Sequence, residues 1–491
     1  MVFSSEAFLY VFLPLALGAY YVAGWLPGGL RPRHLVLTLL SYLFYGWANP
    51  LFTVLMLAST LIDYTLGRLM VASEPLDADG SLATLEPGGP RTLAQKAAVW
   101  ASVVTNLGLL AFFKYFNFGV DSYAAVADAT GLPGLDPSLV MRVTLPLGIS
   151  FYTFQSMSYS IDVYRGHAKP LRNLVDFACY VSMFPQLVAG PIIRFSEVAA
   201  QLRSRTHSLA WFARGVAFFS LGMAKKVCLA NPAAEVADLV FDAPVVAAPE
   251  AWLGTFAYAM QIYFDFSGYS DMAIGLGLMM GFAFPKNFDG PYRSQSITEF
   301  WQRWHLSLSS WLRDYLYIPL GGNRQGERRT YVNLALVMLF GGLWHGASWN
   351  FVVWGAIHGL MLGFERSQGK NSIYRRLPRP VGIAITFGLV CFAWVFFRAP
   401  TLPAALAHLQ AMAGLGAAGD AALAVRALAW APYNLVMIGV AALVVWGAPW
   451  QTWDFTRRLS PVRAAIVVGC LLLALVELST QSYNPFIYFL F

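Results

Sequence analysis

Apolar residues dominate long blocks of this chain, and short polar loops separate the blocks. A block of about 20 apolar residues can cross the hydrocarbon core of a bilayer as an α-helix. The pattern therefore predicts an all-α fold, a polytopic transmembrane bundle of about 11 to 13 helices that forms a single membrane domain over residues 1–491. The expected crossings lie near residues 7–26, 34–49, 51–70, 96–116, 142–161, 209–230, 251–275, 331–348, 351–366, 382–397, 432–449 and 462–480.

One further apolar block, residues 174–193, does not fit the alternation of sides, because basic loops flank it at both ends. Pro185, Gly190 and Pro191 interrupt this block. Non-helical backbone is tolerated at membrane depth only where protein or water covers its polar groups. The block is therefore predicted to be a re-entrant element that returns to the side from which it entered.

Composition excludes a soluble globular protein. The chain is 57% hydrophobic and only 12% charged, whereas a soluble domain carries roughly 25% charged residues. No basic leader with a small-residue cleavage site precedes the first block, so residues 7–26 are expected to be retained as a membrane span.

The net charge of +7 is concentrated in short loops, a pattern typical of membrane orientation and not of nucleic-acid binding. Under the positive-inside rule, the basic loops are expected to be cytoplasmic. These loops lie near residues 31–33, 91–96, 165–172, 286–329, 366–379 and 457–463. Residues 119–139 and 399–431 carry few basic residues and are expected on the opposite side. Lys225 and Lys226, near the outer end of their block, do not follow the rule.

The four cysteines, Cys179, Cys228, Cys391 and Cys470, are scattered through apolar segments without C-x-x-C spacing. This pattern predicts neither a zinc site nor a disulfide framework. No metal is expected, and the cysteines are expected to be packing residues.

Residues 286–330 differ from their surroundings because charges and tryptophans occur together. The pattern indicates a helix with Ser296 or Thr298 as its cap, in which Glu299 and Arg303 are one turn apart and can form an ion pair. One interpretation is an interfacial helix, with tryptophans at headgroup level and charges in water.

The other interpretation is a cytoplasmic or interfacial catalytic segment, because His305 lies in this stretch directly after Trp304. An interfacial anchor needs no histidine between aromatic residues. A neutral imidazole can accept a proton near physiological pH.

His345 lies in a different environment, between Trp344 and Gly346 in an apolar block. A helix that leaves the cytoplasmic loop near Arg329 carries His345 about 21 Å into a core about 30 Å thick. Gly341, Gly342 and Gly346 remove bulk around it, so that a substrate or another helix can approach. A histidine at this depth either forms a hydrogen bond between helices or takes part in catalysis.

Other polar residues in apolar blocks have weaker support as functional groups. His358 lacks a comparable cluster around it and is expected to be structural. Gln261 and Asp265 are four residues apart and share a helix face, whereas Asp271 does not. These carboxylates either line a substrate route or pair with a buried Lys or Arg.

Several of these motifs together resemble the membrane-bound O-acyltransferase superfamily, and within it the bacterial branch that serves alginate O-acetylation. The central motifs are QIYFDFSGYSD at 261–271, FWQRWH at 300–305, WLRDY at 311–315 and LWHGA at 343–347. Further similar segments lie at 44–47, 146–155, 184–192 and 486–489, so the resemblance spans nearly the whole chain.

The resemblance implies a ring of helices around a central funnel, with a donor site reached from the other face. It implies that His345 is the catalytic histidine and that His305 is the second polar position of the site. His345 would remove the proton of a hydroxyl group during its attack on a thioester. His305 would orient the donor or donate a hydrogen bond to the developing oxyanion. No G-x-S-x-G motif is present, which favours direct transfer over a covalent acyl-enzyme.

The resemblance also implies partners. The expected acyl donor is acetyl-CoA from the cytoplasm, with no bound cofactor, and the basic stretch 286–329 is a candidate to meet its phosphates. The expected acceptor is an exported polysaccharide, first of all alginate, with periplasmic acetyltransferases and export machinery as partners in a bacterial inner membrane. Alternatives are O-acetylation of cellulose or peptidoglycan, and D-alanyl transfer to teichoic acid. A transporter of polysaccharide or lipid is an alternative of a different class, although no internal repeat supports it.

Overall fold

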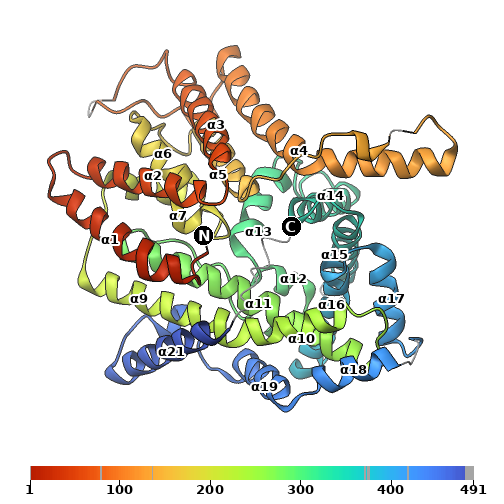
Figure 1. Ribbon diagram of the computed structural model, residues 1–491. Coiled ribbons are helices and arrows are strands. Elements are labelled where there is room, and N and C mark those ends of the chain that lie inside the picture. The colour runs from red at the N-terminus through yellow and green to blue at the C-terminus, as the bar shows by residue number, and fades with distance from the viewer. Residues whose placement is uncertain are drawn as a thin grey trace. The chain divides into compact units, whose positions relative to one another are not determined.

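The computed structural model describes residues 2–77, 80–134, 136–369, 372, 376–416 and 420–481. Within these ranges every regular element is a helix, as the sequence predicts (Figure 1). The chain divides into two compact units, Met1–Ala213 with Leu276–Phe284, and Arg214–Gly275 with Pro285–Phe491. The motif at residues 486–489 lies outside the described residues.

The first unit holds most of the N-terminal helices. It contains the π-helical turn Ala7–Phe12 and helices α1 (Leu13–Val22), α2 (Arg31–Gly46), α3 (Pro50–Leu69), α4 (Leu93–Thr130), α5 (Ile149–Arg165), α6 (Leu174–Ser182), α7 (Phe184–Leu187) and α8 (Phe195–Arg203). Between α3 and α4 the fully buried carboxylate of Asp63 accepts hydrogen bonds from Ser102 at 2.6 Å and Asn106 at 2.8 Å. Such bonds between helices link polar groups that the interior would otherwise leave unpaired.

The block expected to be re-entrant is broken, as Pro185 predicts. α6 ends at Ser182, Met183 adopts a non-helical conformation, and the short α7 follows. Residues 177–193 are all buried within the structure. Protein therefore covers the interrupted backbone, which is the condition for such a break at membrane depth.

The crossing expected at residues 142–161 is wrong in its first part. Residues 140–148 are not helical, and α5 begins at Ile149 after Gly148, whose φ of 73° lies in the left-handed region. Glycine adopts this conformation at little cost, so Gly148 ends the loop and starts the helix. Residues 143–148 therefore form a loop, largely of intermediate exposure, and not an extension of the helix.

The second unit carries the candidate catalytic segments. Its helices are α9 (Leu209–Ala224, from Arg214 on), α10 (Asn231–Phe241), α11 (Ala248–Met279, up to Gly275), α12 (Ile297–Trp301), α13 (Leu306–Leu312), α14 (Glu327–His345), α15 (Trp349–Gln368), α16 (Arg379–Arg398), α17 (Leu402–Met412), α18 (Asp420–Ala429), α19 (Pro432–Gly447), α20 (Thr452–Phe455) and α21 (Pro461–Thr480). A π-helical turn, Lys225–Ala230, joins α9 to α10.

The two lysines that depart from the positive-inside rule are paired with acidic residues of α11. Lys225 contacts Asp271 at 2.6 Å, and Lys226 contacts Asp265 at 2.9 Å. Lys226 and Asp265 are both almost fully buried. Of the two roles open for Asp265, the structure therefore supports pairing with a buried lysine, which offsets part of the cost of burying both charges.

Several helices of the described ranges are long and apolar enough to cross a membrane. These are Ala7–Trp25, Pro50–Leu69, Leu93–Thr130, Arg379–Arg398 and Pro461–Thr480, and the bent pair Ala422–Ala429 and Pro432–Gly447 would add one more. The remaining expected crossings fall on helices that are shorter or more polar, such as α2 with 16 residues.

Helices α14 and α15 lie side by side (Figure 1), and glycines bring their backbones together. A Cβ on Gly355 would lie 2.4 Å from the carbonyl oxygen of Met338, and one on Gly342 would lie 2.2 Å from that of Phe351. Backbone atoms cannot move aside as the end of a flexible side chain can. The close contact therefore fixes the distance between the two helices, and α14 carries His345.

Gly355→Ala is expected to destabilise the protein by about 1–3 kcal/mol, since the added methyl group must push α14 away. Gly359→Ala, one turn further along α15, is the matched control, because its Cβ would lie 3.5 Å from the nearest atom, an ordinary contact. Thermal unfolding of the detergent-solubilised protein checks both. Equal melting temperatures for the two variants would contradict the close packing.

Candidate active site

The short helix α12 begins as the sequence predicts. The Ser296 hydroxyl oxygen accepts a hydrogen bond from the backbone N–H of Glu299 at 3.0 Å. Glu365 of α15 accepts further bonds from the backbone N–H groups of Ile297 at 2.6 Å and Thr298 at 2.8 Å. A carboxylate at a helix N-terminus satisfies its free N–H groups and interacts favourably with its dipole. Glu365 thus ties the start of α12 to α15.

The helix expected after Ser296 or Thr298 is shorter than predicted, because α12 ends at Trp301, before Arg303, and α13 begins only at Leu306. Between them the backbone pairs with another segment. Asp289 N–H donates to the carbonyl of Arg303 at 3.0 Å, and Leu306 N–H donates to that of Asn287 at 2.9 Å. The expected ion pair between Glu299 and Arg303 is present at 2.8 Å.

His305 occupies this break with an unusual backbone conformation. Its φ is 46°, the only positive φ at a non-glycine position among the described residues. Such a conformation costs of order 1–3 kcal/mol and persists where the surroundings enforce it, often at functional sites. The side chain is fully buried, with its Nδ1 3.2 Å from Oδ1 of Asn287 and its ring edge-on to Phe266 at 4.6 Å.

His345 is the last residue of α14 and is only 6% exposed. Its imidazole is surrounded by the rings of Trp344, Trp354 and Phe397, with centroids 5.0, 5.3 and 5.2 Å away. These rings fix its orientation. The helix stops directly after it, at Gly346, whose φ of −162° is extended.

The structure brings the two histidines together, although 39 intervening residues separate them in the sequence. Their ring centroids are 6.4 Å apart. If His345 lies as deep in the bilayer as the rise of α14 implies, His305 lies there too. The part of residues 286–330 around His305 then extends inward to meet the end of α14.

The three glycines around His345 serve two purposes. Gly342 and Gly346 allow close packing, since a Cβ on Gly346 would lie 2.0 Å from the ring of Phe351. Gly341 instead lines a pocket, and its Cβ would meet only a side-chain atom of Leu312 at 3.4 Å. The close approach of a helix is therefore present at Gly342, and Gly341 leaves space toward the pocket.

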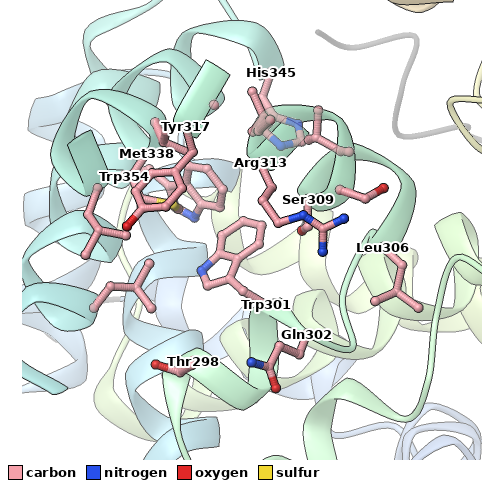
Figure 2. A pocket seen from close by; sticks show the side chains of 17 residues that line it. Thr298, Trp301, Gln302, Leu306, Ser309, Arg313, Tyr317, Met338, His345 and Trp354 are labelled. Atoms are coloured by element: carbon pink, nitrogen blue, oxygen red, sulfur yellow. The ribbon is translucent and has the colours of Figure 1, made fainter. Parts of the chain in front are cut away.

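A pocket of about 480 Å³ opens beside His345 (Figure 2). Trp301 and Trp354 form aromatic walls, and Ser309, Arg313 and Gln302 add polar groups. Pockets of this size, mostly apolar with a few polar groups, bind small molecules or cofactor arms. A buried histidine at the wall of such a pocket can act as a general base on a bound substrate.

Comparison with known proteins identifies the family to which this chain belongs. Residues 165–399 match the model of the membrane-bound O-acyltransferase family, a range that contains both histidines. A protein of Pseudomonas putida named probable alginate O-acetylase is 44% identical over 512 residues and covers 100% of both chains. The chain belongs to the membrane-bound O-acyltransferase family.

Two further relatives extend this likeness. A probable alginate O-acetylase of Pseudomonas aeruginosa is 48% identical over 416 residues, covering 85% of this chain and 75% of the relative. A peptidoglycan O-acetyltransferase of Helicobacter pylori is 34% identical over 446 residues, covering 84% and 80%. The family, the helical membrane fold and the O-acyltransferase class predicted from the sequence are thus confirmed.

His358 of this acyltransferase lies behind the pocket wall. Its Nδ1 accepts a hydrogen bond from the indole N–H of Trp301 at 3.3 Å, and its ring contacts Trp354 at 4.7 Å. Both tryptophans line the pocket, whereas His358 does not. His305 does not line the pocket either, but its ring centroid lies 6.4 Å from that of His345.

Sequence reasoning missed three residues of the candidate site. Asn287 contacts His305, Glu365 caps α12, and Trp354 packs against His345 and lines the pocket with it. Asn287 and Glu365 act on segments far along the chain, which periodicity cannot reveal. For Trp354, the clustering of tryptophans near both histidines was a usable indication.

Proposed function

We propose that this protein transfers an acetyl group from acetyl-CoA on the cytoplasmic side to hydroxyl groups of an exported polysaccharide, alginate. The observation that carries this proposal is the likeness to the Pseudomonas putida protein over the full length of both chains. The expected setting is a bacterial inner membrane, with periplasmic acetyltransferases and export machinery as partners.

In the proposed reaction His345 acts as the general base. The hydroxyl oxygen attacks the thioester carbonyl carbon while its proton passes to the imidazole. The tetrahedral intermediate then collapses, the C–S bond breaks, and the proton returns from His345 to the leaving thiolate. The products are an acetyl ester and free CoA thiol, so atoms and charge balance. His305, 6.4 Å away between ring centroids, is the second histidine of the site.

The purified protein in detergent, supplied with radiolabelled acetyl-CoA and deacetylated alginate oligosaccharides, tests this proposal. We expect the radiolabel in an alkali-labile ester on the oligosaccharide. Where transfer passes through a periplasmic acetyltransferase, that partner must be added and becomes labelled. Peptidoglycan fragments and cellulose oligosaccharides serve as competing acceptors. If only peptidoglycan fragments were labelled, the acceptor would be peptidoglycan and not alginate. If no acceptor led to release of CoA, acetyl-CoA would not be the donor.

Arg313 is the proposed contact for the phosphates of the donor. Its side chain lines the pocket beside His345 and is 61% exposed, with Asp314 at 2.7 Å. Arg313→Gln is expected to raise KM for acetyl-CoA roughly tenfold, or about 1.4 kcal/mol, with little change in kcat. Arg324→Gln removes an exposed arginine of the same segment that does not line the pocket. Equal KM values for the two variants would contradict this assignment.

A further inference from the structure

The side chain of Asn287 connects His305 to two other polar groups in the interior. Its Oδ1 accepts hydrogen bonds from the Ser307 backbone N–H at 3.2 Å and from the Ser307 hydroxyl at 2.9 Å. Its Nδ2 donates to the hydroxyl oxygen of Ser270 at 2.9 Å. Asn287 is 1% exposed. It therefore caps the N-terminus of α13 from a distant part of the chain.

These contacts determine the orientation of the Asn287 amide. A backbone N–H can only donate, so the amide atom that faces Ser307 N–H must be the oxygen. The same oxygen lies 3.2 Å from Nδ1 of His305. Because an amide oxygen can only accept, a favourable contact requires that Nδ1 carry the proton. The Ser307 hydroxyl oxygen also lies 3.3 Å from Nδ1, and it can accept from the same N–H because its own proton is donated to Asn287.

The position of that proton decides the chemistry of the other ring nitrogen. Burial penalises charge, so the fully buried imidazole is favoured in its neutral form, which has one N–H. With the proton on Nδ1, Nε2 carries a lone pair. Nε2 of His305 is buried and has no hydrogen-bond partner among the described residues. A buried acceptor without a donor is unfavourable, and a bound hydroxyl group would remove this penalty.

We propose that Asn287 is a positioning residue that holds His305 as the Nδ1–H tautomer, so that Nε2 accepts a hydrogen bond from a sugar hydroxyl group next to the one that attacks. This assignment rests on the proposed function and refines the role of His305 implied by the family resemblance. A lone pair cannot donate to an oxyanion. His305 therefore orients the sugar through this neighbouring hydroxyl group, whereas the proton of the attacking hydroxyl passes to His345.

The tautomer can be measured in the protein itself, without any substrate. Solid-state NMR of protein labelled with ¹⁵N-histidine distinguishes Nδ1–H from Nε2–H by chemical shift, and the chain has seven histidines. We expect one Nδ1–H resonance pair to disappear in the His305→Asn variant. Assignment of His305 as the Nε2–H tautomer would overturn the proposal, whether or not the protein acetylates alginate.

Kinetics of paired variants test whether Asn287 acts through His305. Asn287→Leu removes the acceptor and is expected to lower kcat about 100-fold without a matching rise in KM for the donor. Asn287→Asp keeps an oxygen toward Nδ1–H and Ser307 N–H, and is expected to retain at least a tenth of wild-type kcat. This rescue variant keeps the test informative if Asn287→Leu fails to fold.

In the His305→Asn background, Asn287→Leu is expected to cause less than a threefold further loss of kcat, because the group it positions is already absent. A full 100-fold further loss would show that Asn287 acts on α13 alone, and would overturn the positioning role. Wild-type protein that shows the expected tautomer but releases no CoA would instead refute the proposed function and leave the tautomer assignment standing.

Discussion

His345→Ala is expected to abolish acetyl transfer, with a loss of about 10² to 10⁴-fold in kcat, the usual contribution of a positioned general base. Its imidazole lies at the wall of the pocket, at the end of α14, and rings of Trp354 and Phe397 hold it in place. Acetyl-ester formation by the purified protein measures the effect. The amount of protein in the membrane should stay near that of wild type, since the lost volume opens toward the pocket.

His345→Gln separates chemistry from packing. Glutamine fills much of the space of histidine but cannot accept the proton of a hydroxyl group at neutral pH, so it should be as inactive as alanine. His358→Gln is the matched control, because His358 is also fully buried and contacts Trp354, but does not line the pocket. Activity above a few per cent of wild type in both His345 variants would exclude His345 as the base.

The sequence predicted the parts of this structure that depend on local patterns. Apolar blocks gave helices, Pro185 marked the break after α6, and Ser296 marked the start of α12. For Asp265 the sequence left two roles open, a substrate route or pairing with a buried Lys or Arg, and the structure shows the pairing. The other inferences needed only residues close together in the chain.

The parts that could not be predicted depend on contacts between distant segments. His305 adopts a positive φ, which sequence usually reveals through glycine or asparagine. The conformation is enforced by backbone pairing with residues 287–289, and nothing near His305 indicates it. For the same reason, the proximity of His305 and His345 was implied only by the family resemblance. Their 6.4 Å separation is a result of the fold.

The orientation of the chain decides whether a cytoplasmic donor can serve an external acceptor, and labelling of single cysteines tests it. We expect a cysteine at Gln325 to resist membrane-impermeant thiol reagents in intact cells, because basic loops remain in the cytoplasm. A cysteine at Thr130 should label fully, since residues 119–139 carry few basic residues. Thr130 is chosen in place of the adjacent Gly131, because the φ of 72° at Gly131 would strain a cysteine introduced there.

The native cysteines set the background of this experiment. Cys179, Cys228 and Cys391 are buried, whereas Cys470 is partly exposed, so Cys470→Ser is introduced first. Both introduced positions are exposed in the structure and should label equally once cells are permeabilised. Labelling at Gln325 in intact cells would place residues 286–329 outside. Arg313 could then not meet a cytoplasmic donor, and acetyl-CoA would have to be replaced by a donor available on the outer side.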